Sequence, residues 1–85
     1  MEKKLVGEIT HYYTKLGVAV VRVGNEINIG DKISIEGTST NFQQEIKSMQ
    51  IEKSAIKKAK KGDMIGLKLD NKAREGDKVY KVIGE

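Results

Sequence analysis

Five lysines lie within nine residues of this chain, and they are the side chains best placed by type and spacing to bind a charged ligand. They are Lys53, Lys57, Lys58, Lys60 and Lys61, with no acidic residue among them. The formal net charge of the chain is +4, so this segment holds the whole excess and the remainder is nearly neutral. A local lysine cluster can hold phosphate groups through charge and counterion release. It can equally be a solvated face that keeps the protein in solution, and both interpretations stay open.

A second group of interest is aromatic. His11, Tyr12 and Tyr13 are consecutive, and Lys15 follows closely. Rings beside a lysine can stack on the bases of single-stranded nucleic acid. Neighbouring residues of a strand point to opposite faces, however, so His11 and Tyr13 would share one side and Tyr12 the other. Packing at the rim of a β-structure is the alternative, since tyrosine favours strands.

Residues for catalysis or metal binding are few. The chain has no cysteine and one histidine, so a thiolate metal site is excluded and a zinc site is not expected. Three aspartates, Asp31, Asp63 and Asp77, each follow a glycine, which indicates turns rather than an acid cluster. We therefore predict no catalytic residue, no bound metal and no cofactor, and a protein that is not an enzyme.

The three glycine–aspartate pairs organise the chain. Each is followed by an apolar run, at residues 30–33, 62–65 and 76–79, which is typical of a turn that starts a β-strand. We expect six strands, over residues 5–13, 16–23, 31–36, 42–51, 63–70 and 77–83, with a bulge near residues 47–48. A brief extended piece is expected at 27–29. Residues 54–61 have Ala55, Ile56 and Ala59 at helical spacing and predict one or two helical turns.

Short strands separated by turns favour a closed barrel. The expected fold class is all-β, a small closed six-stranded antiparallel barrel that forms one domain over residues 1–85. Its inward-facing side chains are predicted from the alternation along the strands. They are Val18, Val20, Ile33, Ile35, Ile65, Leu67 and Val82.

The second strand is apolar on both faces, and a small barrel has room inside for only one set of side chains. With Val18 and Val20 inside, Ala19 and Val21 would form an outer apolar face. A second copy of the chain, giving a homo-oligomer through the second strand, or a separate partner would then cover that face. The alternative cover is residues 54–61 of the same chain.

No stretch approaches the roughly 18–20 apolar residues that span a bilayer, so no membrane association is expected. Residues 1–4 lead directly into a strand without the apolar core of a signal peptide, which favours a cytoplasmic location. The abundance of lysine and glutamate and the lack of cysteine are shared with proteins of hyperthermophiles.

Three stretches in order carry a family resemblance. They are residues 17–23 (Gly-Val-Ala-Val-Val-Arg-Val), residues 29–35 (Ile-Gly-Asp-Lys-Ile-Ser-Ile), and residues 46–51 followed eleven residues later by Gly-Asp-Met-Ile-Gly at 62–66. Over residues 5–82 the chain resembles the second domain of translational GTPases such as elongation factor Tu, the translation-protein barrel. The chain departs from that family at Met64, where the family typically has asparagine. It also lacks a phosphate-binding loop, so GTP hydrolysis is not implied.

The resemblance implies a non-catalytic module of protein biosynthesis. Its partner would be RNA, either tRNA or ribosomal RNA, or a ribonucleoprotein surface. The nucleic-acid-binding residues would be Lys53, Lys57, Lys58, Lys60 and Lys61. The alternative is a protein-interaction module that docks onto a separately encoded enzyme, either a GTPase or a U32-type peptidase, because similar barrels are attached to U32-type peptidases.

Overall fold

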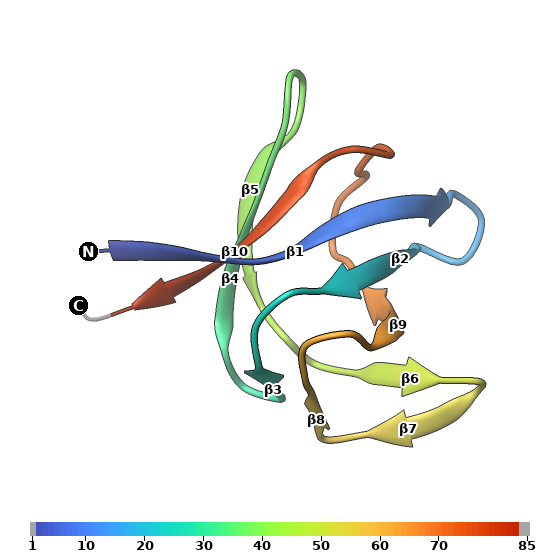
Figure 1. Cartoon of the computed structure of the whole chain (residues 1–85). Helices are drawn as coiled ribbons and strands as arrows, with labels where there is room; N and C mark the ends of the chain where they lie inside the picture. Colours follow the sequence, from blue (N-terminus) through green and yellow to red (C-terminus); the bar gives the residue numbers. More distant parts are fainter. Residues whose placement is uncertain (1, 84–85) are drawn as a thin grey trace.

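The computed structural model describes residues 2–83, and all regular structure in that range is β-strand. Eight strands form one antiparallel sheet in the order β5-β4-β10-β1-β2-β9-β6-β7, and β3 pairs with β8. The sheet coils around one core (Figure 1). The strands are β1 (Glu2–Tyr13), β2 (Val18–Val23), β3 (Ile27–Asn28), β4 (Lys32–Glu36), β5 (Asn41–Glu45), β6 (Met49–Ile51), β7 (Ser54–Ile56), β8 (Lys58–Ala59), β9 (Met64–Lys68) and β10 (Lys78–Ile83).

The all-β class is confirmed, whereas the closed six-stranded barrel is not. The hydrogen-bonded order is open, and within residues 2–83 it ends at β5 on one side and β7 on the other. The Gln44 side chain links β5 to the end of β9 and to the residues that follow it. The Gln44 Nε2 atom donates to the Lys68 carbonyl at 3.0 Å, and Gln44 Oε1 accepts from the Asp70 N–H at 2.7 Å. A side-chain amide thus bridges the sheet where no strand ladder does.

The glycine–aspartate turns are built alike, as the sequence predicts. In the turns at residues 28–31, 60–63 and 74–77, the aspartate N–H donates to the carbonyl three residues earlier, at 3.1, 3.0 and 3.1 Å. The aspartate Oδ2 accepts from the N–H of that same earlier residue, at 2.8, 3.0 and 2.8 Å. The glycine has φ of 96°, 97° and 91°, a region that residues with a side chain rarely adopt.

Each turn also binds the backbone of one residue in a neighbouring segment. The glycine N–H donates to the carbonyl of Ile46, Val23 or Ile9, at 2.9, 2.9 and 2.8 Å respectively. The aspartate carbonyl accepts from the N–H of the same residue at 2.8 Å in all three cases. These three residues are buried, with at most 2% of their surface exposed, so the turns satisfy both backbone groups of three core positions.

The core is aliphatic, and burial of each large side chain contributes about 1.5–3 kcal/mol. Four predicted inward residues, Ile33, Ile35, Ile65 and Leu67, are confirmed as buried. Val82, also predicted inward, is only half-buried, because it lies near the end of β10. The core consists of Val6, Ile9, Ala19, Val21, Val23, Ile27, Ile33, Ile35, Ile46, Met49, Ala59, Ile65, Leu67, Leu69, Ala73 and Val79.

The predicted phase of β2 is wrong. Val18 and Val20 are half-buried, whereas Val21 is completely buried. The face that Val18 and Val20 share also presents Arg22, whose side chain is 62% exposed. Since a strand alternates its side chains, a charged Arg22 outside puts Val21 inside. Val21 therefore cannot be the outer contact expected for an oligomer.

The predicted helix at residues 54–61 is also wrong. That segment forms β7 and β8, and β8 pairs with β3. The turn before β7 is made by Glu52 and Lys53, with φ of 49° and 68°, the sign that a tight two-residue hairpin turn needs. The strand expected at 42–51 is likewise two strands, because the chain breaks at residues 46–48 where a bulge was predicted.

One end of β1 and β10 forms a two-stranded ribbon that runs away from the rest of the sheet (Figure 1). β1 pairs with β10 from Glu2 onward, but it pairs with β2 only from Gly7. Lys3 anchors the ribbon, because its ammonium lies 5.7 Å from the centre of the Tyr80 ring on β10. The same ammonium forms an ion pair with Glu36 on β4.

Two glycine substitutions are expected to differ in cost. A Cβ at Gly76 would meet no atom within 4 Å, so the only cost of Gly76→Ala is the positive φ of that residue. This should lower the free energy of unfolding by about 1–2 kcal/mol. A Cβ at Gly37 would lie 1.9 Å from Oδ1 of the buried Asp77, so Gly37→Ala should lose about 2–4 kcal/mol. Urea unfolding of both variants checks this order. Equal losses would contradict the packing argument.

The ribbon anchor should give stability a dependence on acidic pH. The hydrogen bond from Lys3 and then that from Ser34 lower the pKa of Glu36 from its ordinary 4.5. Since the folded pKa lies below the unfolded one, this contribution is full above the unfolded pKa and disappears as pH falls through the folded pKa. In the Glu36→Gln variant, the melting temperature measured by calorimetry should therefore fall less steeply as the pH drops below 4.5. Glu52→Gln is the control, and an equal flattening there would contradict the assignment.

Candidate functional site

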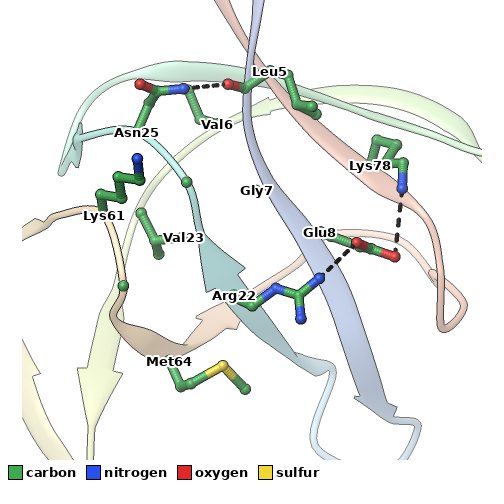
Figure 2. A pocket seen from close by; sticks show the side chains of 12 residues that line it. Leu5, Val6, Gly7, Glu8, Arg22, Val23, Asn25, Lys61, Met64 and Lys78 are labelled. Atoms are coloured by element: carbon green, nitrogen blue, oxygen red, sulfur yellow. Dashed lines mark hydrogen bonds and ion pairs between the residues drawn. The ribbon is translucent and has the colours of Figure 1, made fainter.

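An open groove of about 660 Å³ lies beside β1. Its walls come from residues 5–8 of β1, residues 22–25 at the end of β2, residues 61, 62 and 64 before and in β9, and Lys78 of β10. Figure 2 shows these side chains around the segment where β2 turns away from β1. The groove thus lies at the base of the ribbon, where four segments of the chain meet.

The groove has an apolar part. Leu5 and Met64 are large apolar side chains, yet they are 48% and 49% exposed. Val6 and Val23 line the groove as well and are buried in the core beneath it. Two exposed apolar side chains above a buried floor are what a small apolar binding surface requires.

The groove also has a cationic part. Arg22 Nη2 lies 3.0 Å from Glu8 Oε1, and Lys78 Nζ lies 3.4 Å from Glu8 Oε2 (Figure 2). One carboxylate therefore serves two cations. Lys61 adds a third cation from the turn before β9. Three cations and one carboxylate give the lining a positive charge, which favours an anionic ligand group.

Glycine is needed in the floor of the groove. A Cβ at Gly7 would lie 2.7 Å from Val21 Cγ1 and 3.0 Å from the Arg22 carbonyl oxygen. Both contacts are too short for a side chain to fit without a shift of β1 or β2. Gly7 therefore permits the close approach of the two strands at the point where their pairing begins.

Beyond Gly7, the edge of β1 that faces the groove loses its strand partner. The Val6 carbonyl accepts from the N–H groups of Gly24 and Asn25, at 2.7 and 3.3 Å, and the Leu5 carbonyl accepts from Asn25 Nδ2 at 2.8 Å. Residues 2–4 pair with β10 on one side and, within the part of the chain that the structure describes, with no strand on the other. An exposed strand edge therefore continues from the groove along the ribbon.

The five lysines predicted as a binding site are all exposed. Lys58 lies 3.7 Å from Glu26, and Lys61 alone among the five lines the groove. Lys53 lies in the turn before β7, and Lys57 links β7 to β8. Lys58 is in β8, and Lys60 and Lys61 belong to the turn at residues 60–63.

The aromatic cluster is a rim feature. His11 and Tyr13 share one face, as predicted, with ring centres 4.4 Å apart and planes at 64°. His11 Nδ1 lies 3.1 Å from Glu75 Oε2, and both side chains are largely exposed. Tyr12 takes the other face and packs against the core. The rings therefore pair with each other and with the core, and they do not line the groove.

Within residues 2–83, no group of three histidine, cysteine, aspartate or glutamate side chains is close enough to hold a metal ion. Asp31, Asp63 and Asp77 each belong to a separate turn, in accordance with the turn interpretation. Over the same range, no helix is long and apolar enough to cross a membrane.

The chain is similar to a segment of larger proteolytic proteins. It is 41% identical over 76 residues to an uncharacterized protease of Methanocaldococcus jannaschii, a match that covers 88% of this chain. It is 34% identical over 82 residues to a collagenase of Porphyromonas gingivalis, covering 94% of this chain. The chain spans only 19% and 23% of these relatives. No protein-family model matches the chain.

Solved structures show the same fold. The C-terminal domain of a U32 peptidase from Geobacillus thermoleovorans superposes with a TM-score of 0.88, covering 94% of this chain and 93% of that domain. Its selenomethionine variant gives a TM-score of 0.85. The sequence identity is 20% in both cases. The fold of this chain is therefore that of a U32 peptidase C-terminal domain.

These similarities correct the family expectation. The resemblance to the second domain of elongation factor Tu, and with it the expectations of a role in translation and of RNA binding, is wrong. The relatives are named as proteases or collagenases, and the matching structures are a peptidase domain. The glycine–aspartate turns that carried the resemblance bind the backbone of core residues, so they indicate architecture and not the translation family.

The groove charges are expected to matter little for folding. The side chains of Glu8, Arg22 and Lys78 are 34%, 62% and 44% exposed. Glu8→Gln should therefore change the free energy of unfolding by less than about 1 kcal/mol. Gly7→Ala, which disturbs β1 and β2, should cost about 1–3 kcal/mol. Chemical denaturation measures both, and a larger loss for Glu8→Gln would assign the ion pairs to the fold.

Proposed function

We propose that this chain is a non-catalytic accessory domain that docks onto the catalytic part of a U32-type peptidase. The observation that carries the proposal is the match of nearly the whole chain to an isolated peptidase C-terminal domain. The curated relatives support it, because they are named proteases or collagenases and extend far beyond the matched segment. The remaining four-fifths of such a protein leave room for a separate catalytic unit.

The residues of the groove support a binding role and not a catalytic one. Peptide hydrolysis needs an activated nucleophile or a metal-bound water. His11, the one histidine, is paired with the exposed Glu75 outside the groove. The groove itself presents cations, apolar side chains and glycines, which bind and position a partner.

A domain of this kind acts through local concentration. Holding a catalytic unit and its protein substrate together converts an encounter in solution into an intramolecular one. The rigid β-scaffold suits that task, because its groove side chains project from strands and from hydrogen-bonded turns. The exposed lysines at residues 53–61 would contribute by attracting an acidic protein surface, which speeds association more than it tightens it.

The test uses the U32-type catalytic unit of the same organism, prepared without any segment that matches this chain. Titration of this chain into that unit by calorimetry should show saturable one-to-one binding. Cleavage of gelatin by the unit should rise when the chain is added, whereas the chain alone should not cleave it. Lysozyme, a basic protein of similar size, is the control for charge alone. Cleavage by the isolated chain, or binding no stronger than that of lysozyme, would overturn the proposal.

A further inference from the structure

We propose that the groove and the free edge of β1 bind an extended, acidic segment of a protein partner by strand addition. The choice of a protein partner rests on the proposed function. The site consists of the unpaired edge at residues 2–4, the exposed apolar side chains Leu5 and Met64, and the cations Arg22, Lys61 and Lys78. No catalytic step is involved.

An exposed strand edge presents N–H and C=O groups that a further strand can pair with. β1 carries such an edge from Glu2 to Lys4, opposite its ladder with β10. The ladder with β10 and the ion pair of Lys3 with Glu36 of β4 support the edge from its other side. At about 3.3 Å per residue, residues 2–4 offer pairing along roughly 10 Å of an added strand.

Side chains of the added strand would alternate between two faces. Those on the groove side would meet Leu5 and Met64, which are about half exposed, above the buried Val6 and Val23. Leu5 and Met64 lie at opposite ends of the groove (Figure 2), so aliphatic side chains at two positions of the segment would cover the apolar surface that the chain leaves open. This fixes the first requirement on the partner segment, an apolar residue at alternate positions.

Charge fixes the second requirement. Arg22 and Lys78 share the single carboxylate of Glu8, and Lys61 stands on the turn nearby, so the lining keeps a positive excess. Along the edge itself the exposed Lys4 is balanced by Glu2, and Lys81 opposite Lys4 is ion-paired with Asp31 at 3.3 Å, so the positive excess is that of the groove lining. A segment with glutamate or aspartate between its apolar residues would complement both features.

Nucleic acid fits these features less well. A phosphate backbone would be attracted by the cations, but it has no N–H and C=O rows to pair with a strand edge. The apolar contacts at Leu5 and Met64 also lack the stacking aromatic side chains that single-stranded nucleic acid requires. An extended peptide uses the edge, the apolar pair and the cations together.

The first experiment is an amide NMR titration of the 15N-labelled chain with an eight-residue peptide of alternating glutamate and leucine. Shifts should concentrate at the amides of residues 2–8, 24 and 62. A lysine–leucine peptide of equal length should cause none of these shifts. A single-stranded oligouridylate is titrated in parallel. Shifts of the edge amides by the RNA and not by the glutamate–leucine peptide would overturn the proposal, as would shifts scattered over all exposed lysines.

Variants then test each part of the site. Arg22→Gln and Met64→Ser should each weaken peptide binding by about fivefold or more. Glu8→Gln should strengthen it by about threefold, because it removes the one negative charge of the lining. The matched controls are Lys72→Gln and Leu16→Ser, exposed residues outside the groove, which should stay within about twofold of the wild type. Weaker binding by Glu8→Gln, or equal losses in the controls, would overturn the charge argument.

The last measurement separates this inference from the proposed function. Met64→Ser should weaken binding of the chain to the peptidase catalytic unit as it weakens binding of the peptide. If the Met64→Ser variant binds the catalytic unit as tightly as the wild type does, the groove is not the docking site. If the wild-type chain binds the peptide but not the catalytic unit, strand addition stands and the peptidase is not the partner.

Discussion

Three repeated turns determine how this small sheet is held together. In each, a glycine N–H and an aspartate carbonyl bind the two backbone groups of one buried residue, either Ile9, Val23 or Ile46. A buried backbone group without a partner costs about 1–3 kcal/mol, so these contacts matter in a core of modest size. The aspartate carboxylate then fixes the turn itself through a third hydrogen bond. Turn shape and strand position are therefore set by the same two residues.

The groove is a consequence of the same turns. The turn at residues 60–63 is bound to Val23, and this places Lys61 and Met64 beside the end of β2. The turn at 74–77 is bound to Ile9, and β10 starts directly after it, which brings Lys78 within ion-pair distance of Glu8. Side chains that are far apart in the sequence thus meet at one place because two turns of identical construction hold their strands there.

The sequence alone was sufficient for the turns, for most strands and for much of the core, because those features depend on local patterns. It failed where the pattern was ambiguous. β2 is apolar at every position from Val18 to Val21, and only Arg22, one residue further, indicates which face is outside. The hairpin before β7 turns on Glu52 and Lys53, which carry no glycine or asparagine signal. The groove could not be foreseen, because its lining comes from four segments whose pairing is tertiary.

The distinction between residues of the fold and residues of the groove explains why the family expectation went astray. Glycine–aspartate turns recur wherever a small β-fold must bind its strands in this way, so they report architecture. The charged groove side chains have no such role, since Arg22 and Lys78 are exposed and their ion pairs with Glu8 add little to stability. Leu5 and Met64 leave apolar surface in water, which the fold does not require. The proposed partner segment would cover Leu5 and Met64 and would meet the cations that the fold leaves exposed.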